Sequence, residues 1–354
     1  MKQYDAIIIG FGKGGKLLAA ELAERNWKVA IVERSPQMYG GTCVNVGCIP
    51  TKALIHESEY AEKRYYDDYK NQSKLYALAV ARKDKLVSFL REKNYENVKN
   101  KPNITLYDGT ASFLSENTIR IVSGKDETIL EGKEIFINTG STPILPAIDG
   151  LKESKYVYTS ETLLQSNKLP AHLLVIGGGD TGSDCIGTSV RQGAASVTQI
   201  EIMPQPPIGH NDATPWPQWP VVLKTTSSHE EGCTRRWSLA SNRFIGKNGK
   251  VCGVEVEEVE WLPAAEGGRP TMRPTGKKEI IDTDMVLLAM GFLKPEQPEF
   301  AENVFVAGDA AHGAKFGVSA PAPGPPAAKQ PGRSTYTAAG NRATAKNKYQ
   351  RLKL

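Results

Sequence analysis

Two cysteines, Cys43 and Cys48, lie five positions apart in the segment of residues 40–52. The segment also holds Pro50 and ends in Lys52. A nearby lysine and a helix that starts near Pro50 would both favour the thiolate form of a cysteine over the thiol. A thiolate beside a second cysteine can make and break a disulfide bond. The first chemistry that this segment indicates is therefore thiol–disulfide redox exchange.

The same two cysteines could instead be core residues or half of a metal site. Zinc sites usually combine closely spaced cysteines with further Cys or His ligands at similar spacing, and none follows this pair. The chain has five cysteines, and an odd number argues against a secreted disulfide scaffold. No metal site is predicted, because the remaining cysteines have no partner at a useful spacing; they are Cys185, Cys233 and Cys252.

A glycine-rich turn follows a short apolar run at residues 6–9. A helix-forming stretch comes next, and then a second apolar strand that ends in Glu33. Glycines let the backbone approach a pyrophosphate at the helix N-terminus, and a carboxylate at the strand end can accept hydrogen bonds from an adenosine ribose. The pattern G-x-G-x-x-G is complete, with glycines at Gly10, Gly12 and Gly15.

A second turn of the same kind follows the apolar run of residues 173–176, with glycines at Gly177, Gly179 and Gly182. Its second strand ends in Glu201. A carboxylate there favours NADH, because NADP enzymes often use an arginine for the 2′-phosphate. Two complete fingerprints in one chain indicate a flavoprotein that binds FAD and NAD(P)H. The predicted fold is α/β, with two Rossmann-like dinucleotide-binding domains in three layers around mostly parallel sheets.

The length, composition and charge of the chain limit the class of protein. The chain has 354 residues, enough for two domains, and 40% of them are hydrophobic. No apolar run approaches the roughly 18 residues of a membrane span, so we expect a cytoplasmic protein without a membrane partner. The net charge of +5 comes from residues 313–354, which hold eight Lys/Arg and no Asp/Glu, so the rest carries −3. A mildly acidic body argues against nucleic-acid binding.

Residues 41–52, Gly-Thr-Cys-Val-Asn-Val-Gly-Cys-Ile-Pro-Thr-Lys, resemble the active-site segment of class I pyridine nucleotide-disulfide oxidoreductases. That class includes glutathione reductase, dihydrolipoamide dehydrogenase and mercuric reductase, and the flanking residues look most similar to its reactive-chlorine-resistance branch. The resemblance covers about residues 3–170. It implies that Cys48 forms the charge-transfer thiolate against the flavin and that Cys43 is the interchange thiol. It also places Lys52 near the flavin N5 and assigns FAD binding to Gly41 and Thr42.

Residues 134–143 resemble the segment that crosses between the two domains of these enzymes, where Gly140 would let the backbone pass close to the flavin nucleotide. An ordinary strand followed by a Gly/Pro turn is the alternative.

From residue 171 to about 312 the chain is similar to the small (beta) subunit of glutamate synthase, beginning with residues 177–188. That resemblance implies NADPH, so the choice between NADH and NADPH stays open. It also implies that Asp309 bonds the ribityl chain of the flavin. We further assign Asp184 and Gly291 to cofactor binding. His229, beside two glutamates, is expected to be a solvated polar residue and not an acid–base group.

The predicted FAD-binding domain is discontinuous, comprising residues 1–154 and 296–314, and the NAD(P)H-binding domain covers residues 155–295. Residues 315–354 are predicted to be a disordered basic tail, which a frameshifted coding end or a linker would produce. Because the two resemblances meet near residue 170, we expect a fused or misassembled gene.

The predicted function is an FAD-dependent oxidoreductase that passes a hydride from NAD(P)H to the flavin, and on to the Cys43–Cys48 disulfide or a small acceptor. Class I reductases have a C-terminal interface domain that supplies a His–Glu base, and nothing after Asp309 resembles it. We therefore expect slow exchange with large disulfides. One alternative is an electron-transfer module that serves a glutamate synthase large subunit. Another is an inactive nucleotide-binding remnant.

Overall fold

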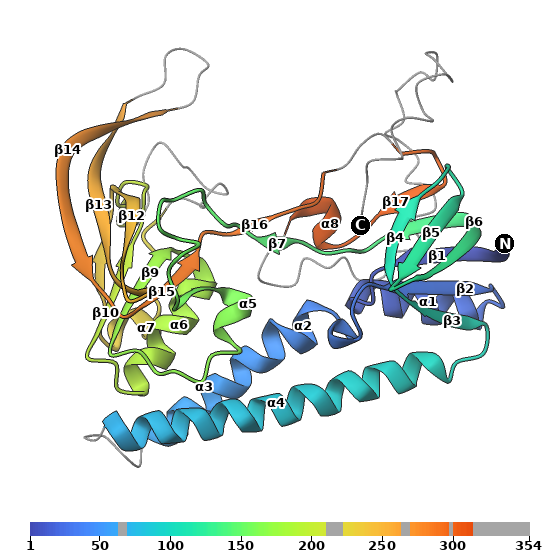
Figure 1. Cartoon of the computed structure of the whole chain (residues 1–354), viewed down its shortest axis with the longest axis horizontal. Helices are drawn as coiled ribbons and strands as arrows, with labels where there is room; N and C mark the ends of the chain where they lie inside the picture. The colour runs from blue at the N-terminus through green and yellow to red at the C-terminus, as the bar shows by residue number, and fades with distance from the viewer. Residues whose placement is uncertain (63–68, 210–221, 263–269, 297–299, 314–354) are drawn as a thin grey trace. The chain divides into compact units, whose positions relative to one another are not determined.

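The computed structural model describes residues 1–62, 69–209, 222–262, 270–296 and 300–313. The chain forms two compact units (Figure 1). Unit 1 contains residues 1–49 and 85–142 and the described residues from 292 onward, and unit 2 contains residues 50–84 and 143–291. The predicted basic tail, residues 315–354, lies outside the described residues. No described helix is both long and apolar enough to cross a membrane.

Unit 1 is built on a seven-stranded sheet in the order β3-β2-β1-β6-β5-β4, in which β17 also pairs with β6. β1, β2, β3, β6 and β17 pair in parallel, whereas β4 and β5 are antiparallel. The strands are β1 (Lys2–Ile9), β2 (Val29–Glu33), β3 (Ile104–Asp108), β4 (Thr110–Phe113), β5 (Thr118–Ser123), β6 (Asp126–Ile137) and β17 (Val304–Val306).

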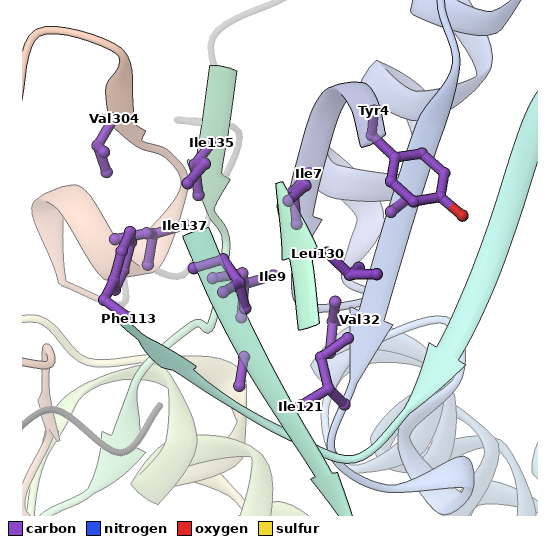
Figure 2. Packing of buried hydrophobic residues seen from close by; sticks show 13 residues of the cluster. Tyr4, Ile7, Ile9, Val32, Phe113, Ile121, Leu130, Ile135, Ile137 and Val304 are labelled. Atoms are coloured by element: carbon purple, nitrogen blue, oxygen red, sulfur yellow. The ribbon is translucent and has the colours of Figure 1, made fainter. Parts of the chain in front are cut away.

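The apolar run in β1 is buried on both faces of this sheet, as expected for a central parallel strand. Successive side chains alternate between the faces. Ile7 and Ile9 join one cluster, shown in Figure 2 with Phe113, Ile135 and Ile137. The neighbours of Ile7 and Ile9 in the strand join a second cluster beneath α1. The sheet therefore holds the end of β1, where the first glycine turn begins, between two cores.

The helices of unit 1 are short except where the chain continues into unit 2. They are α1 (Lys13–Glu24), the 3-10 turn η1 (Pro36–Met38), α2 (Thr42–Asn45) and α8 (Asp309–His312). Two longer helices contribute to both units; they are α3 (Cys48–Glu62) and α4 (Tyr69–Lys99).

Unit 2 has a five-stranded parallel sheet in the order β11-β10-β9-β15-β8. Its strands are β8 (Val157–Thr159), β9 (His172–Gly177), β10 (Ser196–Ile200), β11 (Thr234–Arg236) and β15 (Met285–Ala289). An antiparallel sheet packs on one face through a shared apolar cluster; it comprises β12 (Leu239–Lys247), β13 (Lys250–Leu262) and β14 (Thr271–Asp282). The helices are α5 (Ser160–Leu163), α6 (Gly179–Arg191) and α7 (Ser227–Glu230). β7 (Thr142–Pro143) and β16 (Phe292–Leu293) form a separate two-stranded sheet.

Each unit thus contains a parallel sheet with a strand, a glycine turn and a helix in succession, which confirms the predicted α/β fold with two Rossmann-like halves. Residues 50–84 group with unit 2, and the limits of the two nucleotide-binding domains stay a prediction. Which unit binds which nucleotide stays a prediction.

Candidate functional site

The first glycine turn, residues 10–15, runs in close contact with the end of β6. Gly10 has a φ of +108°, and a Cβ placed on it would lie 2.3 Å from the backbone oxygen of Asn138. A Cβ on Gly15 would lie 2.6 Å from the oxygen of Gly10. Only glycine fits either position, and no side chain caps the N-terminus of α1.

Glu33 ends β2, as predicted, and only 9% of the residue is exposed. Its carboxylate accepts hydrogen bonds from the backbone nitrogen of Phe11 at 2.8 Å and from that of Ser35 at 3.1 Å. The carboxylate therefore holds the glycine turn in place, and its contact with a ribose stays a prediction.

Asn138 belongs to this site, although we did not single it out from the sequence. It follows β6 directly, and its side-chain Nδ2 donates to the oxygen of Gly10 at 3.5 Å. Its Oδ1 lies 3.1 Å from a Cβ placed on Gly14 and 3.2 Å from one placed on Gly308. A polar residue immediately after a buried parallel strand was the available signal, because such positions meet at the carboxyl edge of the sheet.

The cysteine pair begins directly against the first glycine turn. Gly41 has a φ of +75°, and a Cβ on it would lie 2.5 Å from the Cα of Gly12. Cys43 lies in α2 and Cys48 opens α3. Cys43 is half-buried and Cys48 is exposed, and both thiols are free. Burial and the neighbouring Cys48 thiol raise the pKa of Cys43 to about 11.

A buried asparagine holds the loop that carries Cys43. Asn45, 8% exposed, donates from Nδ2 to the backbone oxygens of Tyr39 at 3.0 Å and Gly41 at 2.9 Å. Arg91 of α4 donates from Nε to Asn45 Oδ1 at 2.8 Å. These contacts position α2, and no sequence pattern indicated Asn45 or Arg91.

The structure brings together two predicted site residues that we had assigned to different roles. The Lys52 ammonium lies 3.1 Å from Asp184 Oδ2 in unit 2. Lys52 stands one helical turn after Cys48 in α3, and Asp184 lies in α6. The roles proposed for them at the flavin N5 and at the nucleotide stay predictions.

The second glycine turn, residues 177–182, repeats the geometry of the first at its start. Gly177 has a φ of +103°, and a Cβ on it would lie 2.2 Å from the backbone oxygen of Ala289. Gly179 has a φ of +73° with no atom within 4 Å of such a Cβ. The fit is looser at Gly182, where the nearest atom is Val175 Cγ1 at 3.4 Å.

Glu201 follows β10, and its carboxylate lies 2.9 Å from a Cβ placed on Gly178. Gln199 donates from Nε2 to the oxygen of Gly177 at 3.0 Å, which ties the strand to the turn. Arg235 of β11 lies 3.8 Å from the Glu201 carboxylate. Sequence analysis missed both Gln199 and Arg235.

His229 is partly buried in the structure, and both of its ring nitrogens have protein partners. Its Nδ1 accepts from the backbone nitrogen of Thr226 at 3.1 Å, and its Nε2 lies 3.1 Å from Gln199 Oε1. Burial, and then the charge of Arg235, lower the pKa of His229. His229 caps the N-terminus of the short α7 together with Thr226. The glutamates beside it in the sequence gave no sign of this role.

The remaining predicted positions lie at turns and helix starts. Gly140 has a φ of +75° and Gly291 a φ of +87°. Thr42 is the first residue of α2, and Asp309, which is exposed, is the first residue of α8. Among the described residues, no group of three or more His, Cys, Asp or Glu side chains could hold a metal ion.

Residues 4–214 match the family model of the pyridine nucleotide-disulphide oxidoreductases. The chain belongs to this family. That result confirms the family predicted from residues 41–52, which lie inside the match. FAD and NAD(P)H are the cofactors that the family implies.

Individual relatives match different shares of the chain. The probable pyridine nucleotide-disulfide oxidoreductase RclA of Escherichia coli is 42% identical over 182 residues, which are 51% of this chain and 38% of RclA. Mercuric reductase of Lysinibacillus sphaericus is 36% identical over 186 residues, 51% of this chain and 33% of that protein. The glutamate synthase [NADPH] small chain of Mycobacterium tuberculosis is 39% identical over 153 residues, 42% of this chain and 30% of that protein. The chain thus spans less than half of the length of these relatives.

Among solved structures, the Cu(II) complex of the HOCl-induced flavoprotein disulfide reductase RclA from Escherichia coli matches with a TM-score of 0.69 and 29% identity. The match covers 89% of this chain and 68% of RclA. It agrees with the α/β fold of the two units.

Proposed function

We propose that this pyridine nucleotide-disulphide oxidoreductase uses FAD and NAD(P)H to reduce the Cys43–Cys48 disulfide or a small acceptor. In the balanced reaction, NAD(P)H and one proton deliver two electrons to the disulfide and yield NAD(P)⁺ and two thiols. One observation carries the proposal: the cysteine pair starts directly against the first glycine turn, where a Cβ on Gly41 would lie 2.5 Å from the Cα of Gly12.

The first glycine turn fits the nucleotide part of FAD. Its glycines leave the backbone bare, the N-terminus of α1 offers free N–H groups to a pyrophosphate, and Glu33 stands at the end of β2. Thr42 and Asp309, at the starts of α2 and α8, are the further residues that we assign to FAD. When bound, FAD would supply the hydride acceptor that no side chain provides.

The second glycine turn is the corresponding site for NAD(P)H. Gly177 brings the chain as close to β15 as Gly10 brings it to β6, with Cβ approaches of 2.2 and 2.3 Å to a backbone oxygen. The open space at Gly179 lets a pyrophosphate approach the N-terminus of α6.

Small acceptors suit the cysteine pair better than large disulfides. Burial raises the pKa of Cys43 to about 11, so its thiol is a weak nucleophile near neutral pH, and Lys13 only partly offsets this effect. The names of two relatives point to metal ions: RclA has been solved as a Cu(II) complex, and another relative is a mercuric reductase. We therefore propose metal ions or quinones as the acceptor class.

The test uses purified protein. A flavin absorption band that NAD(P)H bleaches without oxygen, with two additional titratable thiols afterwards, is the expected result. Cys48→Ser should remove the long-wavelength charge-transfer band and retain the bound flavin. Colourless protein would contradict FAD binding and favour the inactive remnant, whereas an unchanged charge-transfer band in Cys48→Ser would exclude the role given to Cys48.

The identity to a glutamate synthase small chain over 42% of the chain favours a second candidate function, an electron-transfer module for a glutamate synthase large subunit. Mixing the protein with such a subunit, glutamine, 2-oxoglutarate and NADPH should then produce glutamate in an NADPH-dependent reaction, and no NADPH-dependent glutamate would exclude this candidate. Because the two kinds of relative each match only part of the chain, we also propose a fused gene. Sequencing the locus across codons 165–175 would test this proposal, and a break in the reading frame there would contradict a natural fusion.

A further inference from the structure

We propose that Arg235 and Trp237 form a subsite for the 2′-phosphate of NADPH, and that the balance between Arg235 and Glu201 sets the preference between NADPH and NADH. This inference rests on the proposed function, because it assigns the nicotinamide nucleotide to the second glycine turn.

The location comes from the pairing of two parallel strands. In β10 and β11, Gln199 pairs with Arg235. Glu201 follows β10, and its carboxylate lies 2.9 Å from a Cβ placed on Gly178, over the glycine turn. The carboxyl end of the second strand is where a Rossmann fold receives the adenosine ribose. Arg235 therefore stands on the neighbouring strand beside the place where a 2′-substituent would lie.

The guanidinium of Arg235 is only partly used by the protein. One terminal nitrogen donates to the backbone oxygen of Lys224 at 3.1 Å. The other is 3.8 Å from Glu201 Oε1, which is an ion pair but too long for a hydrogen bond. The group also lies over the Trp237 ring, 5.0 Å from its centre, and such stacking fixes its orientation before a ligand arrives.

Two buried donors at this place have no hydrogen-bond partner among the described residues. They are Nε of Arg235 and the indole Nε1 of Trp237. A buried donor without a partner costs free energy that an acceptor can recover. A phosphate monoester offers three acceptor oxygens and close to two negative charges, and it forms the strongest such bonds with a guanidinium. A 2′-hydroxyl offers one oxygen and no charge.

Glu201 acts in the opposite direction. A carboxylate at the strand end accepts hydrogen bonds from ribose hydroxyls and repels a 2′-phosphate. With Arg235 3.8 Å away, that repulsion is partly neutralised, so both nucleotides bind and NADPH is not excluded. Removing one charge or the other should therefore shift the preference in opposite directions.

The experiment measures binding and does not depend on turnover. The flavin-loaded protein is titrated in a calorimeter with 2′,5′-ADP and, separately, with 5′-AMP, which lacks only the 2′-phosphate. Arg235→Gln should weaken the binding of 2′,5′-ADP by about tenfold or more and leave that of 5′-AMP within about twofold. Glu201→Gln should tighten the binding of 2′,5′-ADP and weaken that of 5′-AMP, each by about threefold. Trp237→Phe, which keeps the ring and removes the donor, should weaken only 2′,5′-ADP.

The next residue in β11 provides the matched control. The guanidinium of Arg236 is bound by Glu279 on β14, so Arg236→Gln should leave the affinity of both probes unchanged. Unfolding curves check that each variant folds. If Arg235→Gln does not fold, Arg235→Lys replaces it, because lysine keeps the charge and removes the planar guanidinium. Equal losses for both probes in Arg235→Gln, or an equal loss in Arg236→Gln, would overturn the subsite. If neither probe binds the parent protein, the proposed function itself fails.

Discussion

The two glycine turns begin alike and then differ. Gly10 and Gly177 have φ values of +108° and +103°, and a Cβ on either would meet a backbone oxygen at 2.3 or 2.2 Å. At the third glycine the turns separate: a Cβ on Gly15 would lie 2.6 Å from a backbone oxygen, whereas the nearest atom to one on Gly182 is 3.4 Å away. The same fingerprint is thus packed tightly in unit 1 and loosely in unit 2.

The carboxylates at the two strand ends differ in the same way as the turns: the one in unit 1 is held more tightly. Glu33 accepts hydrogen bonds from two backbone nitrogens and is 9% exposed. Glu201 lies beside Arg235 at 3.8 Å, and a quarter of its side chain is exposed. The same glycine motif is therefore followed in one unit by an acidic residue that holds the turn, and in the other by one that lies beside an arginine.

The largest expected effect is at the shared start of both turns. Gly10→Ala and Gly177→Ala should each lower the free energy of unfolding by about 2–4 kcal/mol, since the methyl group needs a left-handed backbone and displaces a strand-end oxygen. Urea unfolding measures both. Gly140→Ala is the control: its φ is also positive, at +75°, but its Cβ would have no neighbour within 4 Å, so we expect a loss of only about 1 kcal/mol. An unchanged free energy of unfolding in Gly10→Ala and Gly177→Ala would contradict the close approach of these glycines to the strand-end oxygens.

Substitution of the third glycine in each turn should change the stability of the two units differently. Gly15→Ala should cost about 2 kcal/mol, because its Cβ would lie 2.6 Å from the oxygen of Gly10. Gly182 lies within α6, where alanine is the better helix former by about 1 kcal/mol, so Gly182→Ala should be neutral or stabilising. If Gly15→Ala and Gly182→Ala lower the free energy of unfolding equally, the proposed difference in packing is contradicted.

The carboxylates give a smaller contrast in stability. Glu33→Gln should cost about 1–2 kcal/mol, because two charge-assisted bonds to backbone nitrogens weaken. Glu201→Gln should change the free energy of unfolding by less than about 0.5 kcal/mol, as is usual for partly exposed ion pairs. A larger loss for Glu201→Gln than for Glu33→Gln would reverse the roles assigned above.

Cysteine reactivity gives a further comparison between the two units. Burial raises the pKa of Cys43 to about 11 and that of Cys185, in α6, to about 12. A raised pKa keeps the thiol protonated at neutral pH, so alkylation by iodoacetamide should accelerate about tenfold per pH unit between pH 7 and 10. Cys43 should react faster than Cys185 at each pH, which peptide mass mapping measures.

Lys13 lowers the pKa of Cys43 by its charge, so Lys13→Met should slow alkylation of Cys43 and leave Cys185 unchanged. A rate for Cys43 that does not depend on pH, or an unchanged rate in Lys13→Met, would contradict these assignments.

The sequence alone determined the two strand–turn–helix units. Apolar runs, glycine spacing and a strand-end carboxylate are local features, and the local backbone needs them wherever the fold places the unit. For that reason Gly10, Gly177 and Glu33 are found where the pattern predicted them.

Only the tertiary structure decided which side chains meet at these turns. Asn138 bonds Gly10 across 128 positions of sequence, and Lys52 pairs with Asp184 across 132. Arg235 reaches Glu201 only because β11 pairs with β10. Such contacts depend on strand order, and periodicity within one segment does not specify the neighbour of a strand. The carboxylate at each strand end could therefore be predicted, but its partner could not.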